Sequence, residues 1–167
     1  MSLPVGTFSL SFLPVAGTFA PAFAAYFVLL NLRVSLVRQS ANTYIGDEVQ
    51  QNAASGSKPG PDTTKPDLDQ SKTLLIASRS HGNFVENVPF ALLVASVAEA
   101  NGAGRGTLIG AHALLFFFRV AHVEYGIRAK DSLGWGRPVG YFGTLIWIAS
   151  MSAYAAWLAG PRSILAF

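Results

Sequence analysis

The chain has 167 residues, of which 51% are hydrophobic and 13% are charged, whereas an ordinary soluble domain carries about 25% charged residues. It has no cysteine, which excludes a disulfide framework and a thiolate nucleophile of its own. The net charge of +3 comes from basic residues scattered around the ends of apolar segments. We therefore expect membrane lipids as partners and no nucleic acid.

The first apolar segment runs from about residue 7 to residue 37 and has no charged side chain before Arg33. About 20 apolar residues cross the roughly 30 Å hydrocarbon core of a bilayer, so this segment predicts a transmembrane helix. Pro14 and Pro21 are expected to bend the helix or delay its start. The apolar run is too long for a signal peptide and lacks a basic n-region, which favours a retained anchor.

Three further helices are predicted, at about residues 72–100, 107–128 and 138–159. Residues 39–71 are rich in Gly, Pro, Ser, Asp and Lys, which predicts a flexible, water-exposed loop. Asn101 to Gly104 ends the second helix, and Glu99 just before it is expected to be solvated. The sequence therefore predicts an all-α integral membrane four-helix bundle, with residues 1–167 forming one domain.

Basic residues predict the orientation of this bundle, because they concentrate in cytoplasmic loops. The first and third connections with their flanks hold nine of them, and the opposite side holds Arg105 and Arg162. Both connections should therefore face the cytoplasm, with the two termini on the other side. The membrane would be the endoplasmic reticulum in a eukaryote and the inner membrane in a bacterium.

One face of the second helix is polar. Arg79, Asn83, Glu86 and Asn87 stand at i, i+4, i+7 and i+8, which places them on the same side of a helix. A charge at membrane depth costs about 2.5–3.5 kcal/mol on insertion scales, so Glu86 needs a partner, a proton or a water-filled cavity. A structural ion pair is the simpler explanation. Several polar residues on one face, matched by a second set, favour a binding site.

The second set lies on the third helix, where Arg119, His122 and Tyr125 step by three and share one broad face. Together with Arg128 and Arg137 near the cytoplasmic end, these residues predict a cationic pocket with one internal carboxylate. Such a pocket suits a small anionic ligand that also carries an ammonium group. The three histidines lack the spacing of a zinc site, so no metal is expected, and His112 is interpreted as a helix contact.

These strings resemble a known family. R-S-H-G-N-F-V-E-N-V-P in the second helix, R-V-A-H-V-E-Y-G in the third and R-P-V-G at the start of the fourth are similar to MAPEG proteins, the membrane-associated proteins in eicosanoid and glutathione metabolism. The resemblance covers nearly the whole chain. It implies a homotrimer that binds glutathione between neighbouring subunits, near the cytoplasmic side.

The resemblance also implies roles for single residues. The glutathione ligands would be Arg38, Arg79, Asn83, Glu86, His122 and Tyr125, and Arg137 would be the catalytic residue that stabilises the thiolate. Departures from better-defined members stand at Gly82, Asn87 and Tyr125, which follows His122 by three residues instead of four. These departures argue against assigning one eicosanoid product.

The function expected from the residues and the resemblance together is a membrane-bound glutathione transferase of the detoxifying type. Its glutathione thiolate would attack hydrophobic electrophiles that enter from the bilayer, and the same thiolate could reduce lipid hydroperoxides as a peroxidase. Two alternatives stay open. One is a non-catalytic, lipid-binding membrane scaffold of the same family. The other is a small transporter, in which charged residues would also line the inside of a bundle.

Overall fold

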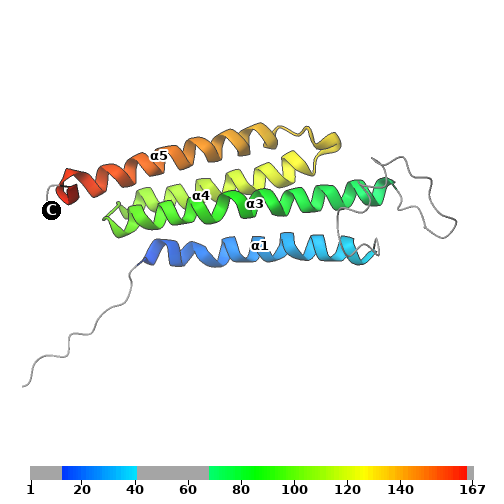
Figure 1. Ribbon diagram of the computed structural model, residues 1–167, viewed down its shortest axis with the longest axis horizontal. Coiled ribbons are helices and arrows are strands. Elements are labelled where there is room, and N and C mark those ends of the chain that lie inside the picture. Colours follow the sequence, from blue (N-terminus) through cyan, green and yellow to red (C-terminus); the bar gives the residue numbers. More distant parts are fainter. Residues whose placement is uncertain (1–12, 41–67, 165–167) are drawn as a thin grey trace, which may run out of the picture.

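The computed structural model describes residues 13–40 and 68–164, and the region it describes is all-α. Its four long helices are α1 (Pro14–Ser40), α3 (Leu68–Ala100), α4 (Arg105–His122) and α5 (Gly136–Ile164). Successive helices run in opposite directions, so α1 begins and α5 ends at the same end of the bundle (Figure 1). The predicted all-α bundle is confirmed. Most of the predicted loop at 39–71 lies outside the described residues.

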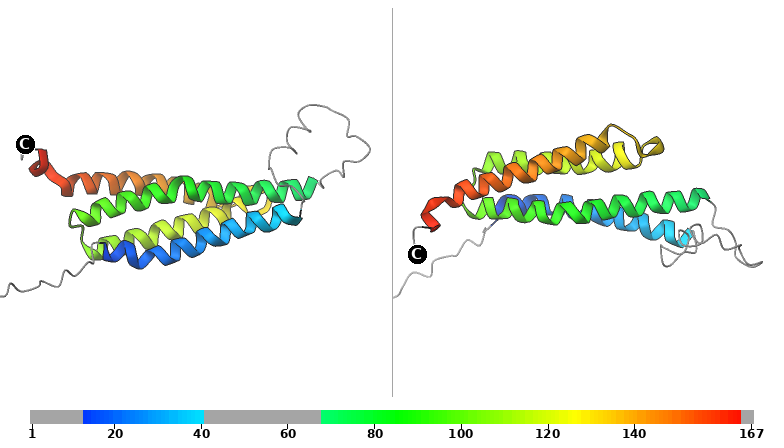
Figure 2. Two further views of the ribbon diagram at one scale, coloured as in Figure 1. Left: turned by 60° about the horizontal axis from the view of Figure 1, so that its bottom comes forward. Right: turned by 45° about the horizontal axis from the view of Figure 1, so that its top comes forward.

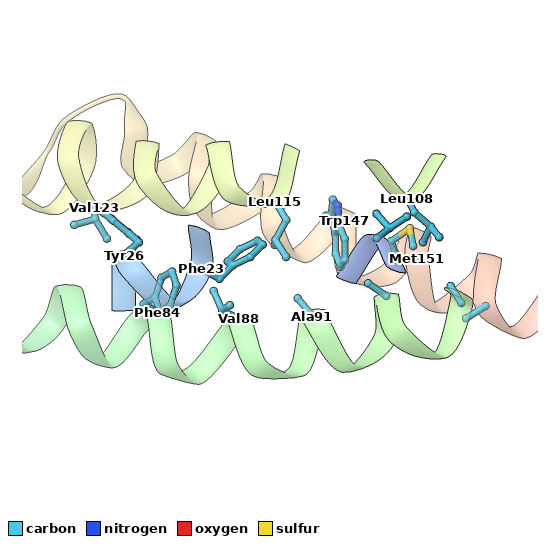
Figure 3. Close-up of a cluster of buried hydrophobic side chains, with 14 of the residues drawn as sticks. Phe23, Tyr26, Phe84, Val88, Ala91, Leu108, Leu115, Val123, Trp147 and Met151 are labelled. Carbon is cyan, nitrogen blue, oxygen red and sulfur yellow. The ribbon is translucent and has the colours of Figure 1, made fainter. Parts of the chain in front are cut away.

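The four helices lie side by side along one long axis (Figure 2). Each buries a single stripe of residues spaced mainly three and four apart, which is the spacing of a coiled-coil seam. In α3 this stripe is Phe84, Val88, Ala91, Ala95 and Ala98; in α4 it is Leu108, His112, Leu115, Arg119 and His122. Figure 3 shows the apolar part of the core as a row of side chains between these two helices.

The backbones of α4 and α5 approach each other closely because glycines face α4. A Cβ built on Gly140 would overlap the Cβ of His122 and the carbonyl oxygen of Phe118. A Cβ built on Gly136 would likewise overlap the carbonyl oxygen of Ala121. Any larger residue would force the start of α5 away from α4. The first turn of α5, which carries Arg137, is therefore fixed against the last turn of α4.

The connection between α3 and α4 is as short as the sequence predicts. Gly102 has a positive φ of 86°, and the backbone N–H groups of Gly102 and Ala103 donate to the carbonyls of Glu99 and Ala98. These two bonds form a Schellman motif, which satisfies carbonyls that a helix end leaves unpaired. The asparagine and glycines after Ala100 therefore stop α3 and return the chain as α4.

Three helical stretches are long and apolar enough to cross a membrane, Pro14–Ser40, Arg105–Ile127 and Gly136–Gly160. The fourth helix, α3, has 33 residues, more than the roughly 20 that a span needs, but its polar residues distinguish its composition from the other three. It packs against α1, α4 and α5. The bundle therefore places a polar helix face among apolar spans, and the chain is an integral membrane protein.

The sequence predicts that Glu99 lies in water, but the structure makes it half-buried and hydrogen-bonded to another helix. Its two carboxylate oxygens accept hydrogen bonds from the backbone N–H groups of Val15 at 2.7 Å and Ala16 at 3.0 Å. The first N–H groups of a helix have no partner within the helix, and the helix dipole favours a negative charge there. A carboxylate at the end of α3 thus caps the start of α1.

We expect Glu99→Gln to destabilise the bundle by about 1 kcal/mol, because the amide offers one acceptor instead of two and carries no charge. The measurement is thermal unfolding in detergent, followed by circular dichroism. Glu86→Gln is the control, since among the described residues the Glu86 carboxylate forms no ion pair. Equal unfolding midpoints for Glu99→Gln and the wild type would contradict the capping role.

Candidate functional site

A cavity of about 870 Å³ lies between α3 and the first turns of α5, beside the end of α4. Pockets of about 300–1,000 Å³ hold ligands of drug size. Five of the seven predicted site residues line it: Arg79, Asn83, Glu86, His122 and Arg137. The structure therefore brings together residues from three helices that stand up to 58 positions apart in the chain, from 79 to 137.

The wall that α3 contributes carries opposite charges. Arg79 and Glu86 both line the cavity, both side chains are exposed, and neither forms an ion pair with another described residue. Asn87, predicted for the same face, instead donates from its amide to the carbonyl oxygen of Asn83 at 2.8 Å. Within residues 13–40 and 68–164, this guanidinium and this carboxylate thus have no ionic partner and could meet a ligand.

Arg119 holds Asn83 in place from the buried side, away from the cavity. One terminal nitrogen of Arg119 donates to Oδ1 of Asn83 at 2.9 Å, and the other donates to the carbonyl oxygen of Gly140 at 2.9 Å. Arg119 is only 2% exposed. The sequence placed it on the face of the site, whereas the structure buries it as a tie between α3, α4 and α5. No described carboxylate pairs with it.

His122 and Arg137 are joined to each other. Nδ1 of His122 lies 2.9 Å from the backbone carbonyl oxygen of Arg137, and a carbonyl only accepts, so Nδ1 carries the proton. The Arg137 side chain is exposed and donates to the carbonyl oxygen of Ser132 at 3.0 Å. This guanidinium makes no ion pair with a described residue. It lines the cavity, with its other N–H donors left for a ligand.

Two predicted residues do not line the cavity, Arg38 and Tyr125. Arg38 is exposed near the end of α1. Tyr125 is 57% exposed and stacks on Trp135 with 5.4 Å between ring centroids. The cause is a π-helical turn, η1 (Val123–Ile127), closed by a bond from the Arg128 N–H to the Val123 carbonyl. The wider turn changes the angle between successive side chains, so Tyr125 leaves the face of His122.

Arg128 also lies outside the cavity, because it pairs with Glu124 at 3.3 Å. No pattern in the sequence links this pair to α1, yet Arg33 of α1 binds the same carboxylate. An i, i+4 spacing was the only local signal for the Arg128 contact. This cluster belongs to the far side of η1.

The cavity has a polar and an apolar side. Its charged lining consists of two guanidiniums and one carboxylate, and the Arg119 charge lies directly behind Asn83. The apolar lining includes Leu75, Ile76, Ile127, Pro138, Tyr141 and Phe142. Such a site can hold a zwitterionic molecule with excess negative charge next to an apolar one.

Comparison with known proteins gives one family. The sequence profile of the MAPEG family matches residues 16–157, which includes every described residue that lines the cavity. No curated protein and no solved structure matches the chain.

Proposed function

The chain belongs to the MAPEG family, and on that premise we propose that it is a glutathione transferase that uses the cavity between α3 and α5. Proteins of this family act in membrane-associated glutathione and eicosanoid metabolism. The observation that carries the proposal is that Arg79 and Glu86 lie on one wall of the cavity and that neither pairs with another charged residue in the described part of the chain.

Glutathione has one ammonium group and two carboxylates, and it therefore complements that wall. Glu86 would accept hydrogen bonds from the ammonium, and Arg79 would hold a carboxylate through paired N–H donors. Asn83, fixed by Arg119, would hydrogen-bond a peptide group of the ligand. The buried Arg119 charge adds to the attraction for a ligand with net negative charge.

Arg137 would stabilise the thiolate of glutathione. A thiol with a pKa near 8.5 is about 3% ionised at pH 7, and lowering that pKa by two units needs about 2.7 kcal/mol of differential stabilisation. A guanidinium next to the sulfur supplies an interaction of this size in a partly dry site. The thiol proton passes to solvent. A carbon–sulfur bond then forms as the leaving group departs with its electron pair.

The electrophile would come from the bilayer. Tyr141 and Phe142 line the cavity and are also exposed on the outside of α5, so an apolar molecule could pass along them to the sulfur. Catalysis would consist of thiolate stabilisation and proximity. As part of the same proposal, neighbouring copies in a homotrimer would cover the exposed side of the site.

Titration with glutathione tests the binding step. We expect the purified protein in detergent to bind glutathione, and Glu86→Gln to weaken the binding at least tenfold, because a hydrogen bond to a charged group contributes about 1.5–3 kcal/mol. Isothermal titration calorimetry measures both affinities. Glu99→Gln at the far end of α3 is the matched control and should bind like the wild type. No binding by the wild type at millimolar glutathione would refute the proposal and favour the lipid-binding scaffold.

A further inference from the structure

A second charged cluster lies at the same end of the bundle, between α1 and η1, outside the cavity. One oxygen of the Glu124 carboxylate accepts from a terminal nitrogen of Arg33 and from the hydroxyl of Tyr26 at 3.1 Å. The other oxygen pairs with Arg128. The side chains of Glu124 and Arg33 are 27% and 29% exposed, so both are largely removed from water. The cluster ties η1 firmly to α1.

The other side of η1 contacts the part of the cavity that Arg137 lines. A Cβ built on Gly126 would lie 2.6 Å from the backbone nitrogen of Arg137, so the backbones of η1 and α5 are in contact. His122, which binds the Arg137 carbonyl, immediately precedes η1, and Ile127 at its end lines the cavity. A displacement of η1 would therefore displace both His122 and Arg137.

We propose that Glu124 is a positioning residue for the reaction, an inference that rests on the proposed function. By anchoring η1 to α1, it fixes the place of His122 and Arg137 relative to the ligand groups on α3. Single π-helical turns are rare and often occur at functional sites. The effect would be large, because a misplacement of about 1 Å caused by a distant mutation can cost about a hundredfold in rate.

Glu99 provides a matched control within the same chain. It too is a glutamate whose carboxylate binds α1, through the N–H groups of Val15 and Ala16, but it does so at the opposite end of the bundle. A merely structural role for Glu124 predicts that the two Glu→Gln variants behave alike. A positioning role predicts that they differ in kcat.

The test measures conjugation of glutathione to an aryl electrophile by the purified full chain. We expect Glu124→Gln to lower kcat about tenfold while the KM for glutathione changes less than about twofold, since Arg79, Asn83 and Glu86 lie on α3. Glu99→Gln should leave both constants unchanged. Arg33→Met should reproduce the kcat loss, and the double variant should be no worse than either single one.

A second readout does not depend on activity. The chain has three tryptophans, and Trp135 stacks on Tyr125 of η1, so its fluorine NMR signal after 5-fluorotryptophan labelling reports the position of η1. The signal should shift in Glu124→Gln and stay in Glu99→Gln. If Glu124→Gln does not fold, Arg33→Met, which removes the same ion pair from the α1 side, serves in its place.

The outcomes separate the two proposals. Full kcat in Glu124→Gln with an active wild type would overturn the positioning role and leave the transferase proposal intact. An unshifted Trp135 signal would overturn it as well, whatever the activity. An inactive wild type that does not bind glutathione would refute the transferase proposal, and with it any role of Glu124 in that reaction, even if Trp135 shifted.

Discussion

Replacing Arg137 with alanine is expected to lower the rate of glutathione conjugation at least tenfold at pH 7. The reason is ionisation of the bound thiol. With the pKa lowered by two units from about 8.5, roughly three quarters of the thiol is ionised at pH 7, compared with about 3% without the guanidinium. The measurement is the initial rate with a general aryl electrophile at saturating glutathione.

The rate difference between the wild type and Arg137→Ala should depend on pH. In Arg137→Ala the thiolate fraction should rise with pH through about 8.5, whereas in the wild type it is already high at pH 7. The difference between the two proteins should therefore shrink as the pH approaches about 9. Arg137→Lys, which keeps a positive charge, should retain part of the rate. Equal rates for Arg137→Ala and the wild type at pH 7 would rule out the thiolate role.

Arg119→Met is expected to weaken glutathione binding at least tenfold without lowering the thermal stability of the protein. The Arg119 side chain is 2% exposed, and its acceptors, Asn83 and Gly140, are neutral. Replacing a buried ion pair with apolar residues of similar volume is often neutral or stabilising, and a buried charge that has only neutral acceptors carries the same desolvation cost without the ionic attraction. The Gly140 carbonyl keeps its bond from the Thr144 hydroxyl at 2.8 Å.

Binding should suffer because Arg119 acts on the ligand in two ways. It holds Asn83 in position, and its charge attracts an anion. Two unit charges interact by about 4 kcal/mol at 4 Å with an effective dielectric constant near 20, and by half of that at twice the distance. A tenfold loss needs only about 1.4 kcal/mol. Calorimetric titration and thermal unfolding measure the two effects, and a variant that unfolds earlier but binds normally would contradict both statements.

Much of the site was predictable because its main wall is one helix. Arg79, Asn83 and Glu86 share a face by the repeat of the α-helix alone, and the structure places all three at the cavity. His122 and Arg137 also line it, and their place followed from the resemblance to the family. What the sequence did not indicate is the tie between them, the bond from His122 to the Arg137 carbonyl.

The mistaken expectations have local causes. Tyr125 was placed with His122 on the assumption of regular α-helical steps, and the π turn η1 breaks that regularity. Glu99 was expected in water because it stands at a helix end, but the start of α1 lies within reach of its carboxylate. A local sequence pattern predicts neither the extra residue of a π turn nor which helix packs next to a helix end.

The sequence by itself determined the four helices, their apolar composition and the polar face of α3, because these depend on composition and on the fixed repeat of the helix. Only the tertiary structure decided which charges stay free and which are paired. Arg79 and Glu86 line the cavity and pair with no charge in the described part of the chain, whereas Glu124 is bound by Arg33 from another helix. Pairing depends on which helices become neighbours and on their rotation, and those follow from packing the whole bundle.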